Sequence, residues 1–129
     1  MEKIVRRGFI STVNPEKHTA RVTFEDEDNL VSEEMPVIVP AANRNNFYAL
    51  PDINDQVIVL YEQIDNQQGS GVILGSIYSE VNQPKVNSQD ITRIDFDDGS
   101  FFEFDRSSGN LTIHCTGNIK VTAKRIDLN

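Results

Sequence analysis

Short runs of alternating apolar and polar residues, each followed by turn-forming residues, cover most of this chain. Such runs are typical of β-strands with one buried face, because successive side chains of a strand point to opposite faces. The pattern predicts a hairpin of residues 8–13 and 20–24 around an Asn-Pro turn. It predicts a second hairpin of residues 56–62 and 71–78. Because residues 57–61 are all apolar, we expect that strand to be buried on both faces.

The other residues of the first part predict loops and one weak strand. Residues 25–34 contain six carboxylates and indicate an acidic loop, and residues 41–55 and 65–69 are polar and turn-rich. Residues 35–40 form an apolar run bounded by prolines, which favours an edge strand or an irregular one. No window predicts a helix. Four or five antiparallel strands in about 80 residues favour a small closed barrel, because closure removes exposed sheet edges.

A different pattern fills the second part: an apolar-polar-apolar triplet that recurs every seven to nine residues, with turn residues between the triplets. The triplets predict five short strands, each with one apolar face. A single flat sheet would leave that face in water, so we expect three copies of the chain to meet around an axis. The result would be a triangular β-helix, or prism, formed as an intertwined homotrimer. The residues expected in its interior are Ile94, Phe96, Phe102, Phe104, Leu111, Ile113, Cys115, Ile119, Val121, Ile126 and Leu128.

Composition separates the two parts. The stretch 80–92 is polar, contains Pro84 and has little periodicity, which indicates a linker. Residues 1–84 carry six basic and 13 acidic residues, whereas residues 85–129 carry six and seven. We therefore predict an all-β protein of two domains, a small barrel at 1–84 and a spike segment at 85–129.

The net charge, the apolar runs and the cysteine count of the chain argue against several classes of protein. A formal net charge of −8 argues against nonspecific binding to nucleic acid or anionic membranes, which requires clustered positive charge. No apolar run approaches the roughly 18 to 20 residues of a membrane span. Residues 1–7 lack the apolar stretch of a signal peptide, so we expect synthesis in the cytosol. A single cysteine, Cys115, excludes an internal disulfide and a multi-cysteine zinc site.

The histidines and the cysteine give no convincing metal or catalytic site. His114 and Cys115 are adjacent, so on a strand they point to opposite faces. Three copies of Cys115 on a trimer axis could hold a metal ion, but a small apolar core residue is the favoured interpretation. His18 is expected to be a solvated residue at the start of a strand. No serine, histidine and carboxylate have a recognisable catalytic spacing.

Two further groups of residues have ordinary interpretations. The carboxylates of residues 25–34 lack the glycine and the periodicity of a calcium loop, so we expect them to be solvated and mobile. Phe47, Tyr48 and Tyr61 could stack on nucleic-acid bases. Because their part of the chain is acidic, packing in the core or at an interface is favoured for all three.

Several pieces of the sequence, in this order, resemble one known family. Two of them are fairly specific together: Leu-Pro-x-x-x-x-x-Val at residues 50–57 and Gly-Val-x-Leu-Gly-x-x-Tyr at residues 71–78. The whole set comprises residues 8–13, 20–24, 35–37, 49–60, 71–80, 96–100 and 126–128. The chain resembles baseplate assembly protein V, the central spike of contractile phage tails and tailocins, and more distantly the spike proteins of type VI secretion.

The resemblance implies a fold, a role and a set of partners. It implies an oligonucleotide/oligosaccharide-binding (OB) type barrel followed by a trimeric β-helical spike, with a structural role and no enzymatic activity. The spike would dock on the baseplate hub and tail tube and pierce the bacterial cell envelope. The particle would be a phage tail baseplate or a tailocin, assembled in the host cytoplasm. Many members hold iron in a His-x-His pair, but His114 is the only histidine after the linker, so we expect no cofactor and no metal.

The end of the chain bears on one further partner. Residues 1–129 finish directly after the apolar pair Ile126 and Leu128, so we expect this end of the trimer to be covered either by a separate small tip protein or by a few flexible terminal residues.

Two alternative functions come from other classes. A monomeric OB barrel that binds single-stranded nucleic acid would require a basic groove with aromatic residues. A trimeric adhesin that binds surface glycans would share the repeated strands but would not pierce a membrane.

Overall fold

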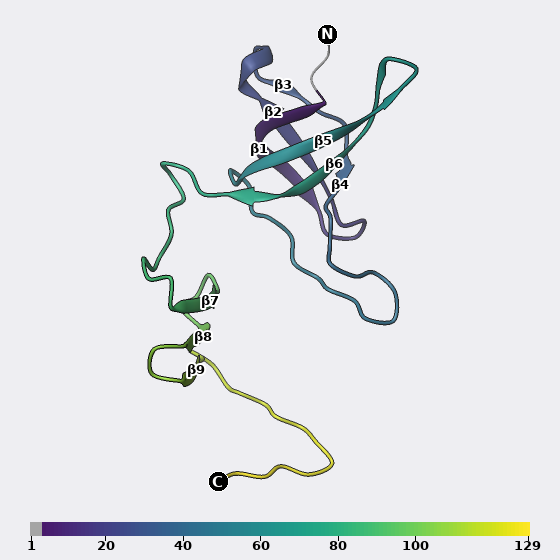
Figure 1. Cartoon of the computed structure of the whole chain (residues 1–129). Coiled ribbons are helices and arrows are strands. Elements are labelled where there is room, and N and C mark those ends of the chain that lie inside the picture. The colour runs from purple at the N-terminus through teal and green to yellow at the C-terminus, as the bar shows by residue number, and fades with distance from the viewer. Residues whose placement is uncertain (1–3) are drawn as a thin grey trace. The chain divides into compact units, whose positions relative to one another are not determined.

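The structure, a computed structural model, describes residues 4–129. The first three residues of the stretch 1–7, which lacks a signal-peptide pattern, lie outside the described residues. The chain forms two compact units, residues 1–83 and 84–129, which are described separately below. The strands of the first unit (Figure 1) are β1 (Val5–Asn14), β2 (Thr19–Phe24), β3 (Leu30–Val31), β4 (Met35–Pro36), β5 (Gln56–Ile64) and β6 (Gln67–Ile77). Between β2 and β3 lies a single 3₁₀ turn, η1 (Glu25–Glu27). No α-helix occurs within residues 4–129, so the all-β prediction is confirmed.

The strands of the first unit curl into a small barrel. Their order is β3-β2-β1-β5-β6, each pair antiparallel, and β4 also pairs with β2. A parallel bridge between Val37 and Ile73 then joins the segment after β4 to β6. The amide N–H of Ile38 donates to the carbonyl of Ile73 at 2.9 Å. Because β4 pairs with β2, these contacts close the sheet between β2 and β6 and cover the edge of β6 there.

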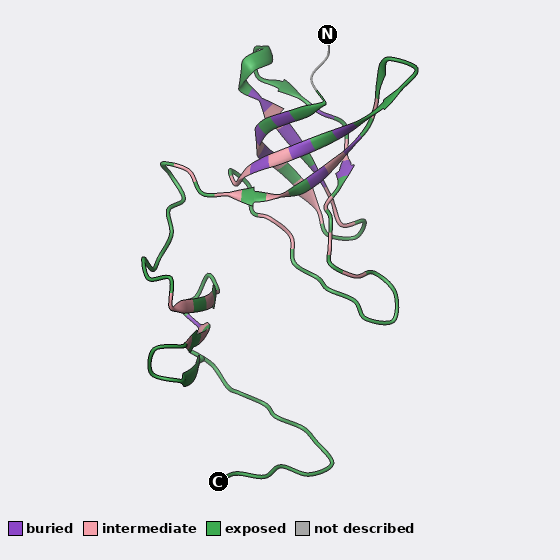
Figure 2. Cartoon of the chain, in the orientation of Figure 1, coloured by how far each residue is buried: buried purple, intermediate pink, exposed green. Residues whose placement is uncertain are grey.

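The core of this barrel comes from alternate residues of its strands. Ala20, Val22 and Phe24 of β2 are buried, as the alternating pattern predicts (Figure 2). The prediction of burial on both faces of β5 is wrong, because Val57 and Val59 are fully buried while Leu60 is 41% exposed. β5 lies between β1 and β6, and its inward face alone contacts the core. The buried apolar residues are Ile10, Ala20, Val22, Phe24, Met35, Val57, Val59, Tyr61 and Ile73.

The hairpin of β5 and β6 is longer than the sequence predicted. Only Asp65 and Asn66 form its turn, with φ values of 50° and 64°. Two successive residues with positive φ are typical of the two-residue turn that matches the twist of antiparallel strands. β6 therefore begins at Gln67 and pairs with Ile64, so most of the predicted loop 65–69 belongs to the strand.

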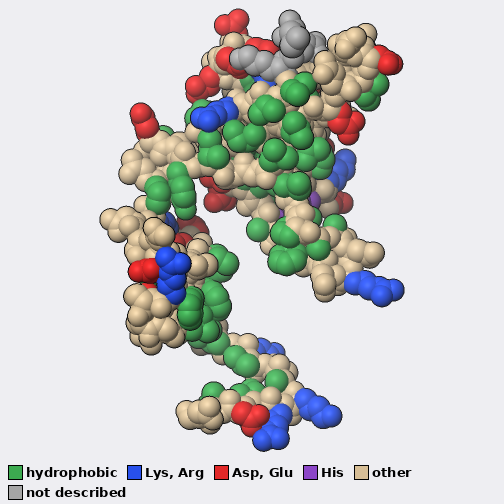
Figure 3. Space-filling view, viewed as in Figure 1, with side chains coloured by type: hydrophobic (Ala, Val, Ile, Leu, Met, Phe, Trp, Pro, Cys, Tyr) green, Lys and Arg blue, Asp and Glu red, His purple; other side chains and the backbone are tan. Residues whose placement is uncertain are grey.

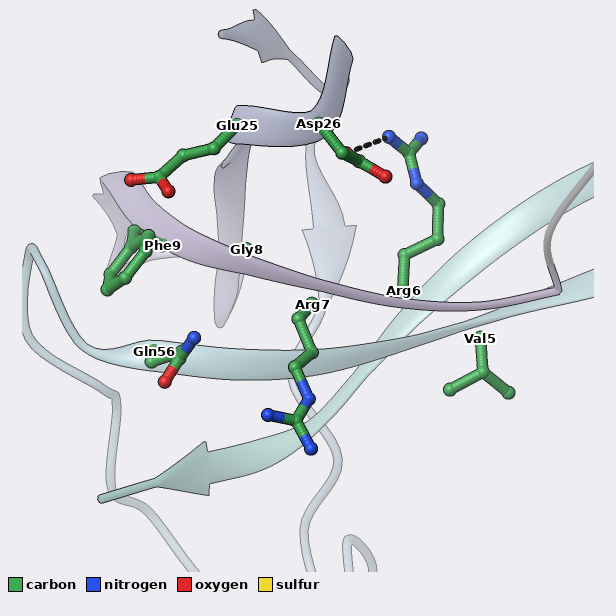
Figure 4. Close-up of a pocket in the computed structure, with 8 residues that line it drawn as sticks. All are labelled: Val5, Arg6, Arg7, Gly8, Phe9, Glu25, Asp26 and Gln56. Carbon is green, nitrogen blue, oxygen red and sulfur yellow. Dashed lines mark hydrogen bonds and ion pairs between the residues drawn. The ribbon is translucent and has the colours of Figure 1, made fainter. Parts of the chain in front are cut away.

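Two carboxylates of the acidic loop pair with an arginine of the barrel. The guanidinium of Arg6 lies 3.2 Å from Asp26 and 3.2 Å from Glu27, and it stacks 3.6 Å from the centre of the Phe24 ring. Figure 4 shows Arg6 and Arg7 on opposite sides of β1, with Arg6 directed at η1. The side chains of Asp26 and Glu27 are 47% and 51% exposed, so both are solvated as predicted, but the sequence did not predict that the buried Arg6 pairs with their carboxylates.

The second unit contains three strands, not the five predicted. They are β7 (Ile91–Asp95), β8 (Phe101–Asp105) and β9 (Asn110–His114), and they form an antiparallel sheet in the order β7-β8-β9. The last two triplets, at 119–121 and 126–128, lie outside the strands and are exposed. Each of the first three triplets has a partner strand within the chain, whereas these two pair with no strand among residues 4–129.

Candidate interaction surface

Two tight turns fix the register of the three-stranded sheet. Gly99, with φ of 92°, lies in the turn between β7 and β8, and Gly109, with φ of 77°, lies in the turn between β8 and β9. A positive φ favours glycine, which has no Cβ to clash with the neighbouring carbonyl. The first turn is closed by the N–H of Phe96, which donates to the carbonyl of Ser100 at 2.9 Å. Residues 96–100 and 106–109 thus connect strands of equal length without a register shift.

The register places five apolar residues of the sheet on one face. Ile94 pairs with Phe102, and Phe102 pairs with Ile113, so these three side chains form one row across the sheet. Phe104 pairs with Leu111 in a second row. Directly opposed side chains on one face of an antiparallel pair lie close enough to contact each other. We call the face formed by Ile94, Phe102, Phe104, Leu111 and Ile113 the apolar face.

The apolar face is open in the single chain. Ile94 is 58% exposed, Phe102 43% and Ile113 55%. Around the three strands of the second unit, hydrophobic side chains gather on one side and charged side chains on the other (Figure 3). Exposed apolar surface of this kind normally marks a site that another molecule covers.

On the opposite face of the sheet, which we call the polar face, the charged side chains of β7 and β8 have partners within the chain. Arg93 lies 2.9 Å from a carboxylate oxygen of Asp95 and 2.9 Å from one of Glu103. Its guanidinium also stacks 3.9 Å from the centre of the Phe101 ring, and that ring stacks on His114 with centroids 5.3 Å apart. The hydrogen bond from Arg93 lowers the pKa of Asp95, and its bonds to both carboxylates raise the pKa of Arg93. This cluster was not predicted from the sequence, although its charged residues occupy the positions that alternate with the apolar ones.

The predicted interior residues outside the strands are also exposed. Phe96 follows β7 and Cys115 follows β9, and together with Phe102 and Ile113 they line one shallow hollow beside the apolar face. The four residues of the last two triplets share no strand and are between 54% and 91% exposed: Ile119, Val121, Ile126 and Leu128. The structure thus brings together the members on β7, β8 and β9 and leaves these four without a strand partner in the part of the chain it describes.

The aromatic and histidine candidates of the barrel have separate roles. Tyr61 is 6% exposed and belongs to the core, where burial, more than the nearby Glu33, raises its pKa. Phe47 and Tyr48 are exposed, so neither packs in the core, and packing at an interface stays a prediction for both. We expected His18 to be solvated, but it is only partly exposed, because its ring packs edge-on against Tyr48 with centroids 5.2 Å apart. These aromatic residues do not form one stacking surface.

Neither a metal centre nor a membrane helix is found in the described region. Across residues 4–129, no group of three or more histidine, cysteine or acidic side chains could hold a metal ion. No helix in the same range is long and apolar enough to cross a membrane.

The comparison with protein families decides what the barrel is. Residues 6–78, more than half of the chain, match the type VI secretion system/phage-baseplate injector OB domain. The chain belongs to this family. A search of curated proteins found no match.

Membership in the injector OB-domain family accounts for the first unit. The matched residues run from the second residue of β1 to just beyond β6, so the barrel is an OB-type domain, as the resemblance implied. The injector OB domain is a structural part of a baseplate, and the chain therefore has a structural role among baseplate and tail components. The match ends before β7, so the apolar face lies outside the matched residues.

Proposed function

We propose that this injector protein forms the central trimeric spike of a contractile phage tail or tailocin. In this proposal residues 1–84 form the docking barrel and residues 85–129 form the spike. Three copies of the sheet β7-β8-β9 meet with their apolar faces toward a common axis. The interior consists of the residues expected from the sequence, from Ile94 to Leu128.

One observation carries the proposal: the apolar face is exposed to solvent, while Arg93 on the polar face already has its ion-pair partners within the chain. Folding normally buries apolar side chains because removing apolar surface from water contributes roughly 25 cal/mol per Å². Here Phe102 and Phe104 remain 43% and 42% exposed in the single chain. A threefold assembly would bury them and leave the polar face with Arg93 in solvent.

The last two triplets support intertwining rather than simple contact of three sheets. Residues 119–121 and 126–128 keep the alternating pattern but have no strand partner in the chain. Backbone N–H and C=O groups that become buried need hydrogen-bond partners. Neighbouring copies would supply these partners, and the two triplets would then form the fourth and fifth strands of a β-helical prism.

The proposed action is mechanical. The barrel would dock on the baseplate hub and tail tube, and contraction of the tail would drive the prism through the bacterial cell envelope. Exposed apolar residues on the outer face of the barrel, among them Val5, Leu60 and Leu74, are available for docking. Ile126 and Leu128 are also exposed, and a separate tip protein that covers them is part of this proposal.

Sedimentation velocity of the full chain tests the proposal. We expect a trimer, and removal of residues 86–129 should leave a folded barrel that is monomeric or only weakly associated. A full-length monomer of 14.5 kDa that keeps the β7-β8-β9 sheet would contradict the proposal. A trimer that binds cell-surface glycans but leaves vesicles of envelope lipids intact would favour an adhesin instead. Binding of single-stranded oligonucleotides by a monomer would favour the nucleic-acid alternative.

A further inference from the structure

Two hydrogen bonds link the first turn of the sheet to the segment that follows β9, and a third lies within that turn. The hydroxyl of Thr116 donates to one carboxylate oxygen of Asp98 at 2.6 Å. The backbone N–H of Thr116 donates to the Ser100 hydroxyl at 3.2 Å. The other oxygen of Asp98 accepts from the backbone N–H of Ser100 at 2.9 Å. We call these three residues the turn clamp.

The turn clamp lies where strand pairing within the chain ends. The last pair of the sheet joins Phe101 of β8 to His114 of β9. Beyond His114 the chain has no strand partner among the described residues, yet the clamp still holds Thr116 against the turn before β8. Ser100 is 8% exposed, which shields its bonds from competing water.

The clamp differs from an ordinary turn, and the chain contains a comparison. In the turn between β8 and β9, Asp105 accepts from the N–H of Ser107 at 2.9 Å and from its hydroxyl at 2.6 Å. That pair has the same chemistry but joins neighbours in one turn. The Asp98 carboxylate instead holds a residue 18 positions further along the chain, at the same 2.6 Å.

We propose that the turn clamp is a positioning device that directs residues 116–129 out of the sheet in the orientation needed to pair with other copies. This inference rests on the proposed trimer. When copies pair, the last residues of each copy must become ordered, and this costs conformational entropy. The cost is lower when the segment already has the orientation needed for pairing. By fixing Thr116, the clamp restricts that freedom before the copies meet. The hydrogen bond from the Thr116 hydroxyl is the first cause of the lowered pKa of Asp98.

The test compares two matched hydroxyl deletions in the full chain. Thr116→Val removes the hydroxyl bond to Asp98, and Ser107→Ala removes the hydroxyl bond to Asp105. Each protein is diluted from urea, and trimer formation is followed by light scattering. We expect Thr116→Val to assemble about tenfold more slowly than wild type, because a hydrogen bond to a charged group is among the stronger ones. Ser107→Ala should assemble at nearly the wild-type rate.

Two further measurements separate positioning from general stability. Hydrogen exchange of the unassembled chain should be faster at the Thr116 amide, which donates to the Ser100 hydroxyl, in the Thr116→Val protein and unchanged in β7, β8 and β9. Thr116→Ser, which keeps the hydroxyl, should restore the wild-type rate. Equal slowing by Thr116→Val and Ser107→Ala, or no slowing by either, would overturn the inference while wild type remains trimeric. A wild-type chain that stays monomeric at all concentrations would instead overturn the proposed function, and the inference with it.

Discussion

Arg93 and Ile94 are neighbours on β7, yet the charged side chain is the better covered of the two. The Arg93 side chain is 21% exposed, whereas Ile94 is 58% exposed. They point to opposite faces of the sheet, and the face of Arg93 has its partners within the chain. This reverses the usual distribution, in which an apolar residue is covered and its charged neighbour is solvated. The reversal is the reason to expect that another molecule covers the apolar face of the second unit.

The first prediction concerns the register of the proposed trimer. Ile113→Asp should abolish trimer formation, because it places three carboxylates near one axis, where unpaired buried charge costs several kcal/mol each. Thr112→Asp, one position away on the polar face, should leave the trimer intact. Sedimentation velocity of both variants gives the result. Equal loss of the trimer in both would show that the two faces have been assigned wrongly.

A second prediction concerns Asp98. Its pKa is lowered to about 2, first by the hydroxyl of Thr116 and then by the bonds from Ser100. A carboxyl group whose pKa is lower in the folded state than in the unfolded state stabilises the folded state at any pH above the unfolded-state pKa. This stabilisation is lost as the pH falls through the folded-state pKa. The turn clamp should therefore persist from neutral pH to about pH 3 and open near pH 2. An NMR titration of the side-chain carboxyl measures this, and an Asp98 pKa near 3.8 would contradict it.

A third prediction concerns the close approach of β1 and β2. A Cβ on Gly8 would lie 2.6 Å from the carbonyl oxygen of Thr23 and still closer to the side chain of Val22. Gly8→Ala should therefore destabilise the barrel by about 1–3 kcal/mol, the usual range for overpacking. Gly117→Ala is the control, because a Cβ there meets nothing within 4 Å in the single chain. Urea unfolding of both variants, followed by the fluorescence of the barrel tyrosines, tests the difference. A Gly8→Ala protein as stable as Gly117→Ala would refute the packing argument.

The fourth prediction concerns Asn54, whose φ is 76°. Its backbone N–H donates to the carbonyl of Ile10 at 2.9 Å, so this conformation is fixed by β1. Asn54→Ala should cost about 1 kcal/mol of barrel stability, because a side chain without local hydrogen bonding tolerates positive φ poorly. Asn54→Gly should be nearly neutral. Thermal unfolding of the two variants distinguishes them, and a stable Ala variant paired with an unstable Gly variant would contradict the backbone explanation.

The sequence predicted the features that depend on local pattern. The alternation along β2 placed Ala20, Val22 and Phe24 in the core because strand geometry alone decides which residues share a face. The turn containing Gly99 was also predicted, since positive φ favours glycine. Strand alternation and turn residues are both local properties, and together they are enough to predict the barrel and the apolar face of the sheet.

Features that depend on distant partners were missed for physical reasons. The pairing of Arg6 with Asp26 joins residues 20 positions apart, and no local pattern specifies it. The exposed Leu60 follows from the place of β5 within the barrel, which a continuous apolar run does not reveal. The turn clamp depends on where Thr116 lies after β9 ends, and this becomes evident only once the register of the sheet is known.

Because the connections of the second unit are short, its sheet should fold before the chain meets other copies. β7, β8 and β9 are joined through residues 96–100 and 106–109, so every strand pair of this sheet is local in sequence. Local hairpins form in roughly 1–10 μs, far faster than protein molecules meet in dilute solution. Each newly made chain would thus present a finished hydrophobic surface while still alone. Its yield in the cell would then depend on how quickly sister chains arrive, and synthesis from one messenger RNA would favour capture before aggregation.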